Sequence, residues 1–210
     1  MKEKFPWKGR FIQSVTFFFI TALLIQFEAI NRMDEKISAG LQALESPLLT
    51  KAFLALTHMG AWQAILLVSL LVLVILCYKG AWGEALFLSL LTALTPLLNA
   101  LLKQGFIRPR PSAYPLIEIS GYSFPSGHTM AAFSLYAGII LLLVPHLRSS
   151  PLRNLLKLFC SFMILMVALS RIYLGVHYPT DIIGGIFASY SLLALLALVF
   201  QFGRRTLQKS

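Results

Sequence analysis

Three short segments of the sequence, at 103–111, 125–128 and 170–181, concentrate side chains that can bind and cleave a phosphate ester. Their basic members include Lys103, Arg110 and Arg171. Three fixed cations are enough to neutralise a phosphate dianion and the additional charge of its transition state. The sequence therefore predicts an anion site with these three side chains as phosphate ligands.

The second segment, Pro125-Ser126-Gly127-His128, immediately precedes a long apolar run. A serine in that place can cap the following helix, and the free amides of the first helical turn point at any bound anion. Gly127 lets the backbone approach the anion closely. We therefore predict that Ser126 and Gly127 contribute to phosphate binding, and that His128 lies at the edge of the anion site.

The third segment pairs a histidine with a carboxylate. Pro179 suits the first position of a helix, which places His177 just outside the helix and Asp181 within its first turn. A carboxylate four residues after a histidine can accept its ring N–H, which fixes the tautomer and turns the other nitrogen toward the phosphate. This is the logic of a catalytic triad with phosphorus in place of carbon. The predicted catalytic residues are His177, His128 and Asp181.

A metal centre is poorly supported by these segments. Asp181 and Glu118 are the only acidic residues within 103–128 and 170–181. A two-metal phosphatase needs more carboxylate ligands than that. We therefore predict chemistry without a metal or any other cofactor.

The composition indicates which elements hold these segments in place. The 210 residues are 58% hydrophobic and 12% charged, whereas a soluble domain has about 45–50% apolar and about 25% charged residues. Six apolar runs occur, at roughly 11–30, 61–78, 84–102, 129–144, 155–170 and 182–202. No cleavage site follows the first run, so we expect a retained span and not a signal peptide. The prediction is an all-α integral membrane protein with six transmembrane helices in one domain, 1–210.

The distribution of basic residues predicts the orientation. Eleven of the 18 lysines and arginines lie in the N-terminus, in the connections around 79 and 148–157, and in the C-terminus. Positive residues collect on the cytoplasmic side, so both termini are predicted to be cytoplasmic, in a multi-pass protein of the plasma membrane. All three phosphate-binding segments then fall on the extracytoplasmic face. The net charge of +10 does not indicate nucleic-acid binding, because the basic residues lie at span ends and form no single patch.

The outer segment 31–60 is too polar to cross a membrane. Apolar residues recur at helical spacing, as at Ile37, Leu41 and Leu44, until Pro47 interrupts the pattern and a second periodic stretch follows. We predict two short amphipathic helices at the outer interface. They form either a simple cap on the bundle or a lid for lipid entry, and the sequence favours the cap.

The three segments match a known pattern. Lys-x6-Arg-Pro, Pro-Ser-Gly-His and Ser-Arg-x5-His-x3-Asp occur in this order and cover about 80 residues. In these motifs the chain resembles the type 2 phosphatidic acid phosphatase superfamily, the membrane-integrated lipid phosphate phosphatases. Its size and layout are similar to those of the small bacterial phosphatidylglycerophosphatases of the B type within that superfamily.

The resemblance implies a mechanism. The second histidine of the family, here His177, attacks phosphorus and forms a phosphohistidine, with Asp181 orienting it. His128 protonates the leaving alkoxide and then helps to activate water. The phosphoryl oxygens are held by Lys103, Arg110, Ser126, Gly127 and Arg171. The implied activity is hydrolysis of phosphatidylglycerophosphate, and secondarily of phosphatidic acid, at the outer leaflet, so lipid phosphates and membrane lipids are the expected partners.

Two other interpretations stay open. Undecaprenyl pyrophosphate phosphatases belong to the same superfamily, although some carry aspartate where this chain has Gly127. A non-catalytic lipid or anion transporter could use the same cations, but its site should lie near the bilayer midplane. Two charged residues outside the motifs have alternative interpretations. Arg108 is either a fourth phosphate ligand or a solvated or headgroup-facing arginine, and the motif favours the second interpretation. Glu28 either lines the substrate path or is simply solvated, and we favour the solvated acid. The sequence does not indicate an oligomeric state.

Overall fold

The computed structural model describes residues 7–111 and 114–207, and the predicted all-α class is confirmed over these ranges. Lys2, Lys4 and Lys209, which enter the charge argument, lie outside them. The helices are α1 Trp7–Leu24, α2 Glu28–Gln42, α3 Pro47–His58, α4 Trp62–Tyr78, α5 Trp82–Phe106, α6 Gly127–Leu142, α7 Ser150–Tyr173 and α8 Pro179–Leu207, with a short 3-10 turn at Val144–His146.

Four helical segments are long and apolar enough to cross a membrane alone: α5, α6 with the 3-10 turn, α7 and α8 up to Phe200. Two further candidates are bent pairs, α1 with α2 at 93° and α3 with α4 at 52°. The fold therefore accommodates up to six spans. The predicted first run, 11–30, extends too far, because α1 ends at Leu24 and the backbone at Phe27 is extended.

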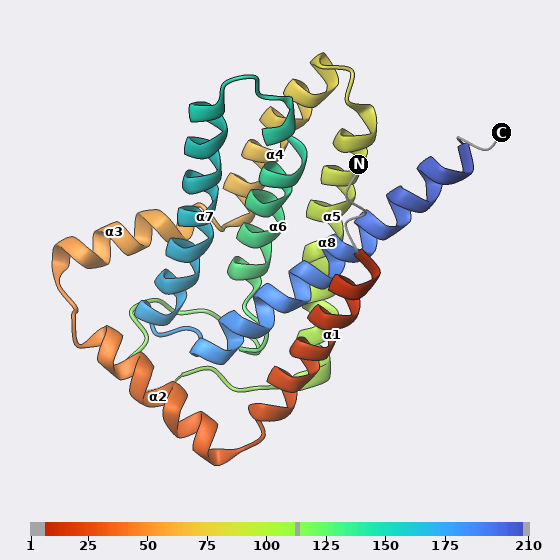
Figure 1. Ribbon diagram of the computed structural model, residues 1–210. Helices are drawn as coiled ribbons and strands as arrows, with labels where there is room; N and C mark the ends of the chain where they lie inside the picture. Colours follow the sequence, from red (N-terminus) through yellow and green to blue (C-terminus); the bar gives the residue numbers. More distant parts are fainter. Residues whose placement is uncertain (1–6, 112–113, 208–210) are drawn as a thin grey trace.

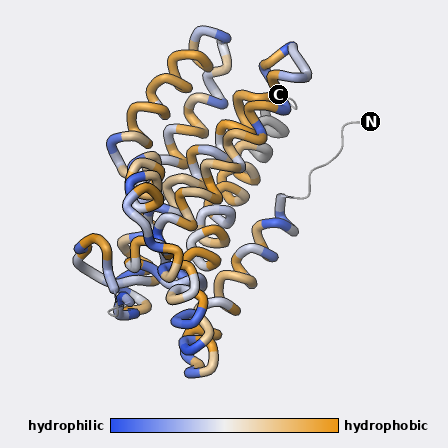
Figure 2. Tube along the Cα trace, turned by 90° about the vertical axis from the view of Figure 1, so that its left-hand side faces the viewer, coloured by the Kyte–Doolittle hydropathy of each residue, from blue (hydrophilic) through white to orange (hydrophobic). Residues whose placement is uncertain are grey.

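The core is centred on α6, which packs against α4, α5, α7 and α8, while α1 packs along α8 (Figure 1). Much of α6 is buried on all sides. The outer helices instead expose large apolar side chains, such as Leu67 on α4, Leu101 on α5 and Leu158 on α7. Figure 2 shows this apolar character along the helices of the bundle. Apolar side chains that face outward in this way suit a lipid environment.

The segments predicted to do chemistry meet at one end of the bundle. They lie where α5 and α7 end and where α6 and α8 begin, whereas the α4–α5 and α6–α7 connections lie at the other end (Figure 1). The expectation that all three motifs share one face is therefore confirmed. Each functional segment is anchored by a long helix of the core.

The two predicted amphipathic helices are α2 and α3. Pro47 opens α3, and the Ser46 hydroxyl accepts a hydrogen bond from the Leu49 amide, so Ser46 caps this helix. The apolar stripe of α2 faces the protein only in part: Met33 and Ile37 are each 47% exposed, whereas Leu41, one turn after Ile37, packs against the core. The buried side chains of α2 are the polar Asp34 and Ser38. They lie on the side of the helix that faces α7 and α8.

Candidate active site

All the predicted catalytic and phosphate-binding side chains lie at the same end of the bundle, on four helices and the connections between them. Lys103 is in the last turn of α5, His128 in the first turn of α6, and Arg171 in the last turn of α7. Electrostatic interactions connect His128 with the three predicted cations and with His177. The structure thus assembles into one cluster groups that are separated by up to 78 positions in the sequence.

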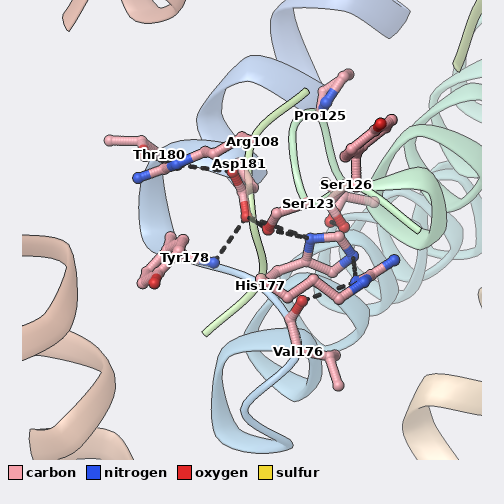
Figure 3. Close-up of polar contacts among 12 residues, drawn as sticks. Arg108, Ser123, Pro125, Ser126, Val176, His177, Tyr178, Thr180 and Asp181 are labelled. Carbon is pink, nitrogen blue, oxygen red and sulfur yellow. Dashed lines mark hydrogen bonds and ion pairs between the residues drawn. The ribbon is translucent and has the colours of Figure 1, made fainter. Parts of the chain in front are cut away.

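The His177–Asp181 pair forms as predicted. The His177 Nδ1 atom lies 3.3 Å from Asp181 Oδ2, and both side chains are buried. The same oxygen accepts the backbone N–H of Tyr178 at 2.8 Å and the hydroxyl proton of Ser123 (Figure 3). Asp181 is therefore held by several donors, and its orientation fixes that of the imidazole.

The partner of the other imidazole nitrogen decides the tautomer. Arg110 Nη1 lies 3.2 Å from His177 Nε2. A guanidinium can only donate hydrogen bonds, so Nε2 must offer its lone pair and the ring proton is on Nδ1, facing Asp181. Nε2 is thus the nitrogen available to attack an electrophile at the position that Arg110 approaches.

His177 is poised in its neutral form. Burial lowers its pKa to about 4, even though the hydrogen bond to Asp181 and the charge of that carboxylate favour the protonated ring. The cations Arg171 and Arg110 lower the pKa further. A neutral imidazole at physiological pH is the form that a nucleophile requires.

Two of the predicted phosphate ligands hold the connection between α5 and α6. Lys103 Nζ donates to the Tyr122 carbonyl at 2.6 Å. Arg110 donates through Nε to the carbonyl of Gly121 at 3.0 Å and through Nη1 to that of Val176 at 2.8 Å. Both cations therefore line the site, with backbone carbonyls as their acceptors.

Arg171 is the most deeply buried of the three cations, at 1% exposure. Its Nη1 donates to the Thr57 hydroxyl of α3 at 2.6 Å. Among the described residues, no acceptor lies within hydrogen-bonding distance of Nε. A buried donor without a partner is costly, so this guanidinium is well suited to a ligand that brings its own acceptor oxygens.

The expected cap at Ser126 is wrong. Ser126 occupies the N-cap position of α6, but its hydroxyl makes no capping bond and instead accepts the hydroxyl proton of Thr129 at 3.0 Å. Its backbone N–H donates to the Asp181 carbonyl at 3.1 Å and so joins α6 to α8. The first-turn amides of α6 are therefore not capped by this side chain.

Gly127 packs closely against Asn99, a residue that lies outside the three motifs. Asn99 Nδ2 donates to the Pro125 carbonyl at 3.0 Å. A Cβ atom at position 127 would lie 2.8 Å from Asn99 Oδ1, closer than packed atoms tolerate. An asparagine within an apolar span was the available signal, because such a polar group needs a partner at membrane depth.

The interpretation of Arg108 as solvated is also wrong. This side chain is 7% exposed, and its guanidinium donates to Asp181 Oδ1 at 2.7 Å and to Asp34 Oδ2 at 2.8 Å. The backbone turns sharply at Ile107, whose φ is +43°, and this brings Arg108 back under the bundle. Glu28, in contrast, is solvated as expected and pairs with the exposed Arg32.

A cavity of about 710 Å³ adjoins the cluster, between α4, α5 and α6. Lys103 and His128 line it, together with apolar side chains such as Leu66, Leu70 and Ala93. Over residues 7–111 and 114–207, no group of three His, Cys, Asp or Glu side chains is arranged to hold a metal ion. The site therefore consists of cations, two histidines and one aspartate beside an apolar cavity.

A family model described as the PAP2 superfamily matches residues 84–205, more than half of the chain. The chain belongs to the PAP2 superfamily. It is 34% identical over 170 residues to phosphatidylglycerophosphatase B of Bacillus subtilis (strain 168), covering 80% of this chain and 84% of that protein. The matched region of the family contains the chemistry-bearing ends of all four core helices.

Solved structures agree with this assignment. The crystal structure of a transmembrane PAP2-type phosphatidylglycerolphosphate phosphatase from Bacillus subtilis superposes with a TM-score of 0.84 at 32% identity, over 90% of this chain and 95% of that one. The crystal structure of Aquifex aeolicus LpxE, at 22% identity, gives a TM-score of 0.63 over 78% of this chain and 93% of that one, which shows a shared fold.

Acid should destabilise the protein through His177. Its folded pKa of about 4 lies below the ordinary value of 6.5, so the unfolded chain binds more protons between these pH values and stability falls as the pH decreases through that window. The expected loss is about 3 kcal/mol. His177→Asn should remove most of this acid-induced loss of unfolding free energy, as measured by unfolding in detergent from pH 7 to pH 4. The control is His58→Asn, at an exposed position, which should keep the loss. The same acid sensitivity in His177→Asn and in the unchanged protein would contradict this account.

Proposed function

We propose that this protein is a membrane lipid phosphatase that hydrolyses phosphatidylglycerophosphate through a phosphohistidine on His177. Membership of the PAP2 superfamily and the likeness to phosphatidylglycerophosphatase B support a phosphoric monoester hydrolase acting on a lipid phosphate. The strongest structural support is that the cluster of cations and histidines opens into an apolar cavity, which Lys103 and His128 line. A substrate with a phosphate head and hydrocarbon tails fits both parts at once.

The cavity supports a lipid in particular. It runs along apolar faces of α4, α5 and α6, and it reaches Lys103 and His128 at its polar end. A phosphate held at that end leaves the tails beside side chains such as Leu66 and Leu70. The lipid therefore stays in an apolar environment while only its headgroup enters the cluster.

In the first chemical step, His177 Nε2 attacks phosphorus and forms an N–P bond. The bound phosphate dianion favours the protonated form of the adjacent His128. As the bond from phosphorus to the glycerol oxygen breaks, His128 gives this proton to the alkoxide. Asp181 accepts a hydrogen bond from Nδ1–H of His177 and stabilises the positive charge that develops on the ring. Lys103, Arg110 and Arg171 neutralise the phosphoryl oxygens in the transition state.

In the second step, water attacks the phosphohistidine. His128, now neutral, takes a proton from the water as the new P–O bond forms and the N–P bond breaks. Inorganic phosphate leaves, His177 is neutral again, and His128 has regained its proton. One water is consumed in each turnover, and no redox partner or metal takes part in either step.

The substrate proposal is tested by phosphate release from the purified protein in one detergent. Phosphatidylglycerophosphate should be hydrolysed fastest, followed by phosphatidic acid, with undecaprenyl diphosphate slowest. Activity should survive excess EDTA, because fixed cations carry the charge that a metal would otherwise neutralise. Faster release from undecaprenyl diphosphate would move the enzyme to the other branch of the superfamily. No release from any of the three would favour a non-catalytic transporter.

The roles of the two histidines are tested by trapping the intermediate. With a substrate labelled on phosphorus, His177→Ala should form no acid-labile phosphoenzyme and show no turnover. His128→Ala should keep the nucleophile but lose about 10²–10⁴-fold in rate, the usual contribution of general acid catalysis. Mass spectrometry of the quenched protein locates the label. A label found on His128 would exchange the two roles.

We also propose that the active site faces the outside of the plasma membrane and that both termini are cytoplasmic. The bias of basic residues toward the α4–α5 and α6–α7 connections and the termini supports this orientation. A headgroup of the outer leaflet then reaches the cluster without leaving the bilayer surface.

Cysteine labelling tests the orientation. In a variant with Cys77 and Cys160 replaced, a cysteine introduced at the exposed Ser120 should react with an impermeant maleimide in intact cells. One introduced at the exposed Ser150, at the other end of the bundle, should react only after permeabilisation. The opposite labelling pattern would place the active site in the cytoplasm.

A further inference from the structure

Arg108 binds the side of Asp181 that His177 does not use. Its Nη1 donates to Asp181 Oδ1 at 2.7 Å and to the Thr180 hydroxyl at 2.7 Å. The guanidinium also lies over the ring of Tyr178, 4.4 Å from its centroid. Arg108 thus contacts Tyr178, just before α8, and two residues of the first turn of α8, while the other carboxylate oxygen of Asp181 faces His177 (Figure 3).

The other half of the Arg108 guanidinium is held by α2. Its Nη2 donates to Asp34 Oδ2 and to Asn31 Oδ1, each at 2.8 Å. Asp34 is fully buried, and its Oδ1 accepts the backbone N–H of Thr180 at 3.1 Å. Since Thr180 is the second residue of α8, Asp34 satisfies one of the free amides at this helix N-terminus.

This arrangement places two buried carboxylates on one guanidinium. A buried charge is tolerated when it is paired and its remaining hydrogen bonds are made. Asp34 and Asp181 each meet this condition through Arg108, and Asp181 meets it without giving up the oxygen that faces His177. Rotation of the Asp181 carboxylate would break the bond to Arg108, so its orientation is fixed from the far side.

We propose that Arg108 and Asp34 are positioning residues for catalysis: Arg108 holds Asp181 in the orientation that aligns His177, and Asp34 holds Arg108. Helix α2 is then a fixed support for the site, through the buried side chain of Asp34. A lid role would require α2 to leave and return, and each opening would separate the buried pair of Asp34 and Arg108. The proposal rests on the role of His177 as the nucleophile oriented by Asp181.

The test compares Arg108→Gln, Asp34→Asn and the double variant with the unchanged protein, using phosphatidylglycerophosphate in detergent. Arg108→Gln should lower kcat and the single-turnover rate of phosphoenzyme formation by about 10²-fold, the effect of a misaligned reacting group. KM should change little, because Arg108 does not contact the substrate. Asp34→Asn should lower kcat by a smaller factor.

The double variant separates positioning from folding. Arg108→Gln leaves Asp34 buried without its cation and can destabilise the protein, whereas adding Asp34→Asn removes that charge and should recover thermal stability. Its kcat should nevertheless equal that of Arg108→Gln alone, because Asp34 acts through Arg108. Arg32→Gln, which removes an exposed ion pair from the same helix, is the matched control and should keep full kcat.

Three outcomes would overturn the proposal. One is a kcat in Arg108→Gln or in the double variant that matches the unchanged protein. Another is a loss that appears only in KM. The third is an effect of Asp34→Asn on kcat that is the same with and without Arg108, since Asp34 would then act by another route. Failure of the proposed function is distinguishable, because the unchanged protein itself would then form no phosphoenzyme on His177.

Discussion

The arrangement of the active-site segments depends above all on one buried carboxylate, that of Asp181. A carboxylate removed from water must be paired and hydrogen-bonded on both oxygens, and here each oxygen has a separate set of partners. Oδ1 accepts from Arg108, while Oδ2 accepts from Ser123 and the Tyr178 amide and faces His177. These partners come from the connection between α5 and α6 and from the start of α8. Satisfying a single side chain therefore brings together the segments from which the active site is built.

The position of the site at helix ends follows from the same constraint. Within the apolar middle of the bundle, a group of cations and an aspartate would find neither water nor enough backbone partners. At the ends of α5 and α7, free carbonyls and connecting loops supply acceptors for Lys103 and Arg110. The start of α6 supplies His128 and uncapped amides. A phosphate chemistry that needs both charge and access to lipid tails is thus placed where the charged and apolar environments meet.

The sequence predicted most of the fold and the central part of the site, because these rest on short-range rules. Apolar runs of span length predicted the helices. The four-residue spacing between His177 and Asp181, with Pro179 at the start of a helix, predicted the contact of these two side chains. The support from Arg108 and Asp34 was missed, since it joins residues 74 positions apart and depends on the left-handed turn at Ile107. The capping role given to Ser126 was wrong because Thr129 competes for its hydroxyl. Local pattern cannot reveal which of two nearby donors a side chain will meet.

The outward-facing apolar side chains of α2 have a physical reason that applies to membrane proteins in general. In a soluble protein an apolar stripe marks the side of a helix that packs on the core. At the edge of a bilayer the surroundings are themselves apolar, so apolar side chains such as Met33 and Ile37 can face outward. The inward face is then free to be polar, and on α2 it carries Asp34 and Ser38. A charged residue on the polar face of an interfacial helix is therefore a candidate partner for buried charge in the adjacent site. In this chain, Asp34 takes that place beside the catalytic cluster.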